Sequence, residues 1–115
     1  METSEVLFEV TDGVGVLTLN RPAKFNALTL DMRDNGIPDI IAQVENDPDI
    51  RALIVTGAGG NFCSGADVGR MGGNSAQSVT PEDRSVGLRR TLDWVYRLAN
   101  LNRPVIAAVD GGAFG

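Results

Sequence analysis

The segment from Gly57 to Asp67, GAGGNFCSGAD, has four glycines in eleven residues and directly follows the apolar run ALIVT at Ala52–Thr56. Its side chains offer little chemistry. Cys63 and Ser64 have no neighbouring base in the sequence, and we interpret Cys63 as a small buried packing residue. The main-chain N–H groups remain as candidates to bind a ligand, because small residues let a substrate carbonyl approach them. Two such donors directed at one oxygen form an oxyanion hole.

Other kinds of site fit the sequence poorly. A dinucleotide-binding fingerprint needs glycine at position 62, where Phe62 stands, and the phosphate-binding Gly-Lys-Ser/Thr pattern is absent. The chain has no histidine, which excludes histidine-based triads and histidine metal sites. Asp67 could act as a general base, but we interpret it as a cap of the short segment that follows Ala66. A plain surface loop stays open as the alternative.

A second apolar run, VIAAV at Val105–Val109, also leads into small residues, GGAFG at 111–115. Runs that are apolar throughout predict strands covered on both faces. The helix expected between the two runs suits a parallel pair, and ligands of α/β sheets bind at the carboxyl ends of such strands. One donor near Ala66 and another near Gly115 would then face one site. The spacing permits this geometry without establishing it.

Patterns in the rest of the chain predict the elements that would position this site. Alternating residues around Asp12-Gly13 indicate a β-hairpin at Glu5–Asn20. Helices are expected near Leu30–Asn46, capped by Thr29 and kinked or restarted at Pro38, and near Pro81–Asn100. Apolar residues at helical spacing predict the buried faces: Leu30, Ile37, Ile40, Ile41 and Val44 on the first helix, and Leu88, Leu92, Val95 and Ala99, widened by Trp94 and Leu98, on the second.

Composition narrows the function classes. The chain has 115 residues, 43% apolar and 22% charged, as expected for a globular α/β domain or part of one. Its net charge of −5 argues against nucleic acid or an anionic membrane as partners. No apolar run approaches the roughly 20 residues that span a bilayer, and no signal peptide is visible. The single cysteine excludes an internal disulfide, so we expect a cytoplasmic setting.

Three motifs carry a resemblance to a known family. VLTLNRPAKFNAL, RALIVTGAGGNFCSGADV and NRPVIAAVDGGAFG resemble, in order and spacing, the enoyl-CoA hydratase/isomerase (crotonase) family over nearly the whole chain. The resemblance implies a spiral of ββα turns and assembly into homo-oligomers, either trimers or pairs of trimers. It also implies chemistry in which two backbone N–H groups stabilise the enolate of an acyl-CoA thioester.

The resemblance assigns site residues. Ala66 N–H would be the first oxyanion donor. The second comes from the Gly-Gly-Gly that begins at Gly115, and its middle glycine would be residue 116. The coenzyme A side would be lined by Lys24, Phe25, Ala27, Gly65, Asp67 and Val68, with Lys24 approaching the phosphates. No metal and no separate cofactor are implied, because coenzyme A enters as part of the substrate.

Family members usually run to more than twice this length, and the two glutamates of their hydratases lie beyond position 115. We therefore expect residues 1–115 to be the N-terminal part of a single crotonase-like domain, inactive alone. The default reaction of the parent protein is hydration of a 2-enoyl-CoA. Another family reaction (isomerase, dehalogenase or synthase), a non-catalytic binder of CoA thioesters and an interaction fragment are the alternatives.

Overall fold

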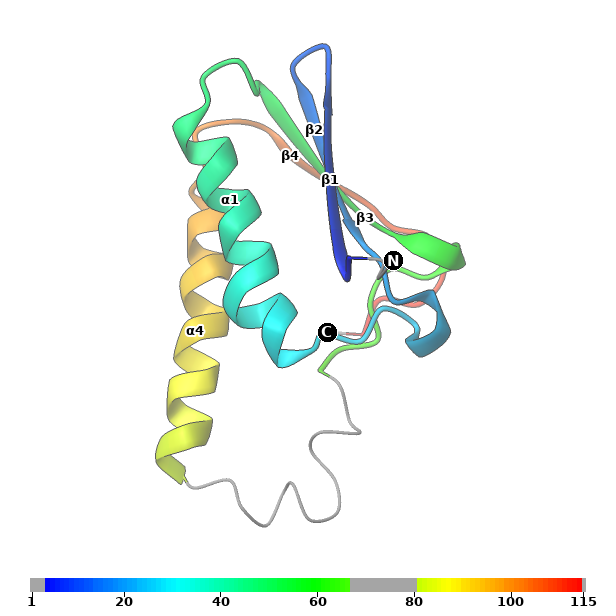
Figure 1. The fold of residues 1–115 in the computed structure, drawn as a ribbon, viewed down its shortest axis with the longest axis vertical. Coiled ribbons are helices and arrows are strands. Elements are labelled where there is room, and N and C mark those ends of the chain that lie inside the picture. Colours follow the sequence, from blue (N-terminus) through cyan, green and yellow to red (C-terminus); the bar gives the residue numbers. More distant parts are fainter. Residues whose placement is uncertain (1–3, 67–80, 115) are drawn as a thin grey trace.

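The computed structural model describes residues 4–66 and 81–114, which form a four-stranded sheet with the order β1-β2-β3-β4 (Figure 1). β1 (Val6–Thr11) pairs antiparallel with β2 (Val14–Leu19). β3 (Ala52–Gly57) lies parallel to β2, and β4 (Val105–Ala108) lies parallel to β3. The predicted α/β class and the predicted parallel pair in one sheet are therefore confirmed.

The β1–β2 hairpin closes as its sequence predicts. Asp12 and Gly13 both have positive φ, 51° and 80°, as a type I′ turn requires. At the open end, the N–H of Asn20 donates to the carbonyl of Glu5 at 2.8 Å. The hairpin thus spans Glu5–Asn20 and places the loop after β2 next to the start of β1.

The first helix begins at Leu30 and contains a π-helical turn, η2 (Met32–Gly36), before α1 (Ile37–Asn46). Thr29 Oγ1 accepts the N–H of Met32 at 3.1 Å, which confirms the predicted cap. Pro38 has no N–H, and its ring would press against the carbonyl four residues earlier in a regular helix. The wider π turn relieves this crowding, so the predicted irregularity lies just before Pro38.

The core lies between α1 and the sheet. Ile37, Ile40, Ile41 and Val44 are buried against Leu17, Leu19 and Leu53, among others. Leu30 was predicted on the same buried face, and that prediction is wrong, because its side chain is 43% exposed. The π turn adds residues to one helical turn and rotates Leu30 out of phase with α1. Met32, wholly buried, occupies the core position instead.

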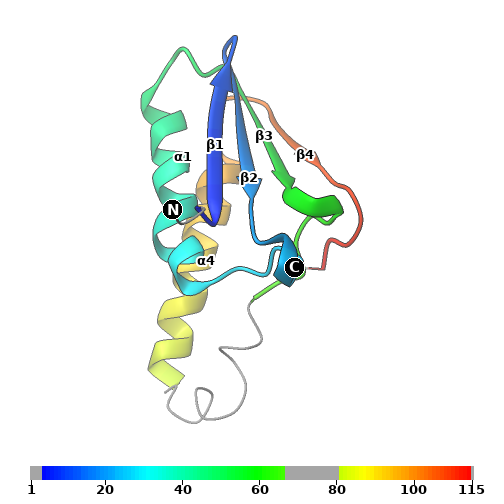
Figure 2. The same cartoon turned by 45° about the vertical axis from the view of Figure 1, so that its right-hand side comes forward.

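The second helix, α4 (Pro81–Ala99), packs beside α1 on one face of the sheet (Figure 2). Its inner side carries Gly87, Trp94 and Leu98. The stripe predicted to be buried is exposed, so that prediction is wrong for its members, Leu88 (61%), Leu92 (56%), Val95 (43%) and Ala99. Helical spacing identifies an apolar face, but the neighbouring elements decide whether anything covers it.

β4 also departs from expectation, because all four of its residues are exposed. Ile106 is 53% exposed and Val109, beyond the strand, is 54% exposed. The predicted burial on both faces is therefore wrong within the described residues. β4 is the outer strand of the sheet, and no described strand pairs with its free edge.

Candidate functional site

Three loops meet at one end of the sheet, where β2, β3 and β4 all end (Figure 2). The loop after β2 contains the short helix η1 (Pro22–Lys24), and the loop after β3 begins with η3 (Ala58–Gly60). The loop after β4 reaches the last described residues, 109–114. Because parallel strands end at the same edge, the two glycine-rich segments lie together, as predicted.

The loop after β3 is joined to the loop after β2 by main-chain hydrogen bonds. Ser64 N–H donates to the carbonyl of Phe25 at 3.0 Å, and Leu28 N–H donates to the carbonyl of Gly65 at 2.7 Å. Leu28 and Ala66 form a parallel bridge. These bonds fix one side of the glycine-rich segment.

The other side of that segment is joined to the loop after β4. The carbonyl of Gly112 accepts the N–H groups of Phe62 and Cys63 at 2.9 and 3.1 Å, and Phe114 N–H donates to the carbonyl of Cys63 at 2.8 Å. Cys63 and Ala113 form a second parallel bridge. The glycine-rich segment thus lies between the other two loops and extends the sheet beyond its strands.

The direction of the Ala66 N–H follows from these bonds. Gly65 C=O and Ala66 N–H belong to one peptide plane and point in opposite directions. Since the carbonyl of Gly65 faces Leu28, the N–H of Ala66 points away from the loop after β2. Ala66 is exposed, and among residues 4–66 and 81–114 its N–H has no acceptor. This group can therefore donate a hydrogen bond to an oxygen of a ligand.

The glycines of this segment serve two different purposes. A Cβ on Gly57 would lie 2.5 Å from the carbonyl oxygen of Phe62, and a Cβ on Gly59 would lie 2.5 Å from Pro22 Cβ. Close packing explains these two, and Gly59 also has a positive φ of 76°. Gly60 and Gly65 have positive φ, 83° and 111°, and a Cβ on either would meet no atom of the described residues within 4 Å. Among residues 4–66 and 81–114, nothing fills the space beside Gly65, the residue before the unpaired Ala66 N–H.

The loop after β2 carries three of the residues that the resemblance assigns to coenzyme A. Lys24 is exposed, and Phe25 is 62% exposed with a left-handed φ of 52°. Ala27 is buried, and its carbonyl accepts a hydrogen bond from Arg21 Nη1 at 2.7 Å. The structure therefore brings Lys24, Phe25 and Ala27 to the same loop cluster as Gly65 and Ala66. Asp67, Val68 and Gly115 lie outside the described residues.

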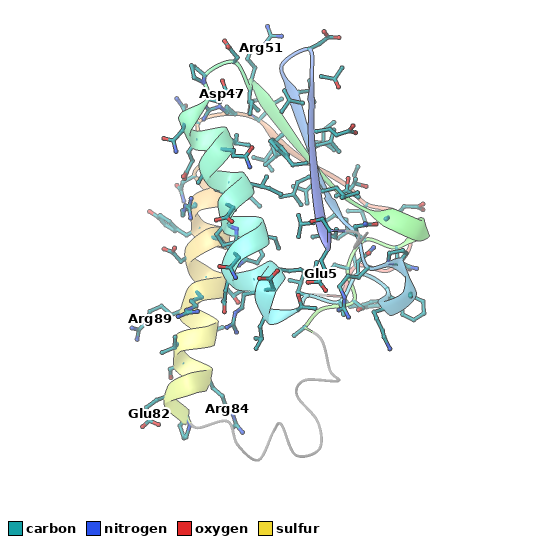
Figure 3. All side chains as sticks on the ribbon, in the orientation of Figure 1. Glu5, Asp47, Arg51, Glu82, Arg84 and Arg89 are labelled. Atoms are coloured by element: carbon teal, nitrogen blue, oxygen red, sulfur yellow. The ribbon has the colours of Figure 1, made fainter. Side chains whose placement is uncertain are left out.

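The charged side chains labelled in Figure 3 lie at different ends of the molecule. Glu5 lies at the loop end, whereas Asp47 and Arg51 lie at the opposite end and Glu82, Arg84 and Arg89 lie on the first turns of α4 (Figure 3). Glu5 accepts a hydrogen bond from Thr29 Oγ1 at 2.8 Å and pairs with Arg21 at 3.4 Å. These contacts hold the base of the loop after β2.

Metal and membrane features are likewise absent from the described ranges. Within residues 4–66 and 81–114, no three His, Cys, Asp or Glu side chains gather where they could share a metal ion. Neither helix in those ranges combines the length and apolarity needed to cross a membrane.

Sequence reasoning missed two asparagines. Asn26 is wholly buried with φ of 59°, and Asn61 is half-buried between the loops. For Asn26 the available signal was residue type, since asparagine tolerates left-handed backbone better than most residues other than glycine. Asn61 has extended backbone, with φ of −133°, and gave no such signal. Cys63, 2% exposed, is the buried packing residue that the sequence indicated.

The fold and the site together define an α/β protein whose candidate ligand site lies at the carboxyl edge of a mixed sheet and offers the main-chain N–H of Ala66. The profile of the family described as "Enoyl-CoA hydratase/isomerase" matches residues 9–115. The chain belongs to this family, and the predicted resemblance is confirmed.

Relatives of known name include both hydratases and isomerases. The chain is 39% identical to the short-chain-enoyl-CoA hydratase of Clostridium acetobutylicum, over 100% of this chain and 42% of that protein. It is 37% identical to the 1,2-epoxyphenylacetyl-CoA isomerase of Escherichia coli, over 96% of this chain and 41% of that protein. The chain thus spans about two fifths of the length of these relatives.

A solved structure shows the same fold. An enoyl-CoA hydratase/isomerase from Xanthobacter autotrophicus Py2 superposes with a TM-score of 0.84 at 36% sequence identity, over 96% of this chain and 40% of that one. The expected crotonase-like fold, in the part of it that this chain spans, is therefore confirmed.

Proposed function

We propose that this chain supplies the thioester-binding part of an acyl-CoA enzyme, with the Ala66 N–H as one donor to the thioester oxygen. One observation carries the proposal. Among the described residues, the Ala66 N–H has no acceptor and points away from Leu28, beside open space at Gly65. The thioester oxygen becomes more negative when the substrate forms an enolate. A preoriented N–H therefore stabilises the enolate-like transition state more than it stabilises the bound substrate.

The coenzyme A part of the substrate would lie along the loop after β2. Lys24 is exposed at the end of η1 and supplies a positive charge for phosphate. Phe25 offers an exposed aromatic surface. We propose that these residues, with Ala27, Gly65, Asp67 and Val68, form the coenzyme A side, and that Gly115 begins the segment with the second donor. No resident cofactor is needed, because coenzyme A is carried by the substrate.

The default reaction is hydration of a 2-enoyl-CoA, in which hydroxide adds to C3 and a proton to C2. The family membership and the names of the relatives support an acyl-CoA thioester as substrate, and those names include isomerases. Another family reaction or thioester binding without turnover remains the alternative. We further propose a cytoplasmic homo-oligomer, a trimer or a hexamer, for the whole protein.

Two substitutions at Ala66 test the oxyanion assignment. Ala66→Pro deletes the N–H, whereas Ala66→Gly keeps it. In a whole enzyme that contains this chain, Ala66→Pro should lower kcat for crotonyl-CoA hydration at least ~10²-fold, and Ala66→Gly should lower it much less. Thermal melting of both variants controls for misfolding. Equal losses in two folded variants would show that Ala66 is not the donor, and no activity of the wild-type enzyme on any acyl-CoA would remove the enzyme proposal.

A further inference from the structure

Asn26 is the one buried polar residue among the described residues, and both polar atoms of its amide group are hydrogen-bonded. Its Oδ1 accepts the N–H of Arg21 at 2.8 Å. Its Nδ2 donates to the carbonyls of Ala58 at 2.9 Å and Asn61 at 2.8 Å. One side chain therefore ties the loop after β2 to both ends of η3, in the loop after β3.

Asn61 continues the connection to the third loop. Its main-chain carbonyl is bound by Asn26, and its side-chain Oδ1 accepts the N–H of Gly112 at 3.0 Å. The carbonyl of Gly112 in turn accepts the N–H groups of Phe62 and Cys63. Asn26 and Asn61 thus form a hydrogen-bonded chain through all three loops of the site. We call this pair the asparagine clasp.

Two glycines make room for the clasp. A Cβ on Gly57 would lie 2.7 Å from Asn26 Nδ2, and a Cβ on Gly111 would lie 2.8 Å from Asn61 Oδ1. Neither glycine could be replaced without displacing an asparagine side chain or a loop carbonyl. The close fit leaves the two amide groups little freedom to change partners.

We propose that the asparagine clasp positions the oxyanion donor at Ala66. Beyond the strand ends, the bridges Leu28–Ala66 and Cys63–Ala113 continue the pairing of the three loops. The clasp adds side-chain cross-links between the same loops, through Asn26 and Asn61. Together with these bridges it sets where the Ala66 N–H points relative to the loop after β4. Asn26 and Asn61 are positioning residues, and this inference rests on the function proposed above.

The same chemical change at the two asparagines should have opposite results. Asn61→Asp keeps an oxygen that accepts the Gly112 N–H, so the clasp should survive. Asn26→Asp replaces the Nδ2 donor by an oxygen that faces two carbonyl oxygens, so the clasp should open. Asn61→Leu, at the half-buried position, removes the acceptor and provides a second opening variant if Asn26→Asp does not fold.

The measurement is the preference of the chain for a thioester carbonyl. Calorimetry compares acetyl-CoA with S-ethyl-CoA, a thioether that lacks the carbonyl. One correctly placed N–H should make acetyl-CoA bind roughly two- to tenfold more tightly. Asn61→Asp should keep this ratio. Asn61→Leu and Asn26→Asp should reduce it to about one while S-ethyl-CoA still binds, which a general loss of stability would not produce.

The Ala66 amide signal in an ¹H–¹⁵N spectrum gives a readout that needs no ligand. It should move in Asn61→Leu and stay in Asn61→Asp. The inference is overturned if Asn61→Leu keeps both the carbonyl preference and the Ala66 signal, or if both aspartate variants behave alike while folded. A wild-type chain without carbonyl preference would instead count against the proposed function, and the Ala66 signal would still decide whether the clasp sets the position of that donor.

Discussion

Replacing Gly57 by alanine should destabilise the protein through a collision in the loop cluster. Gly57 has extended backbone, φ −125° and ψ 144°, which alanine adopts without strain. A Cβ there would meet the carbonyl oxygen of Asn61, that of Phe62 at 2.5 Å and Asn26 Nδ2 at 2.7 Å. Two of these three atoms belong to the backbone, so the loop itself must move.

The magnitude follows from the groups that must move. Overpacking at a closely packed position costs about 1–3 kcal/mol. Displacing Asn61 also breaks its hydrogen bond with the buried amide of Asn26, a further loss of about 1 kcal/mol. We therefore expect Gly57→Ala to reduce the free energy of unfolding by about 2–4 kcal/mol.

Gly60→Ala is the matched control from the same segment. A Cβ on Gly60 meets no atom of the described residues within 4 Å, so its effect comes from the positive φ of 83°. That strain amounts to about 1 kcal/mol. The two substitutions thus separate loop packing from backbone conformation.

Urea unfolding followed by fluorescence provides the assay. Trp94 is the sole tryptophan and packs against the core, so its emission reports the folded state. With a slope near ~2 kcal/mol/M, Gly57→Ala should unfold at a midpoint lower than that of Gly60→Ala by about 0.5–1.5 M. Equal midpoints for the two variants would refute the argument that Gly57 is required by packing around Asn26.

Two further predictions concern α4 and the exposed surface. The hydrogen bond from Arg33 holds the pKa of Asp34 below its usual value of 3.8, and that from Arg97 holds the pKa of Glu45 below 4.5. These lowered pKa values add stability above about pH 4.5, and this stability is lost as the pH falls through them. Arg97→Gln should therefore weaken the acid dependence of unfolding, followed by Trp94 fluorescence, whereas Arg89→Gln should leave it unchanged. Identical pH profiles for the two variants would contradict the role of the Arg97–Glu45 pair. Sedimentation should show the 12.2 kDa chain self-associating as its concentration rises, because the stripe of Leu88, Leu92 and Val95 and the free edge of β4 are exposed. Leu92→Lys should reduce this association while Arg84→Lys leaves it unchanged, and a wild-type monomer at all concentrations would show that these faces do not pair with further copies.

Local patterns were enough to predict the elements near the site. Asp12-Gly13 specifies a hairpin turn, Thr29 caps a helix, and apolar runs give two parallel strands, because each depends on short-range geometry. The glycine-rich motifs also predicted a site at the strand ends, where the structure brings those segments together. These features carried the family resemblance, which the family match over residues 9–115 confirms.

Such patterns could not predict which apolar faces are buried in the folded protein. Leu30 leaves the core because a π turn shifts its phase, and Leu88 and Leu92 face outward because α4 turns Trp94 and Leu98 inward. Periodicity shows that a face is apolar, whereas burial depends on what lies against it in three dimensions.

By itself, the sequence determined the class of fold, the two glycine-rich loops and the absence of histidine chemistry. Only the tertiary structure decided which N–H of the glycine-rich segment lacks an acceptor among the described residues, why Gly57 differs from Gly65, and that Asn26 and Asn61 join the three loops. The physical reason is the distance along the sequence over which each interaction acts. Turn and cap preferences act over a few residues, but the hydrogen bond of Asn26 with Asn61 spans 35 positions and exists only after the strands have brought the loops together.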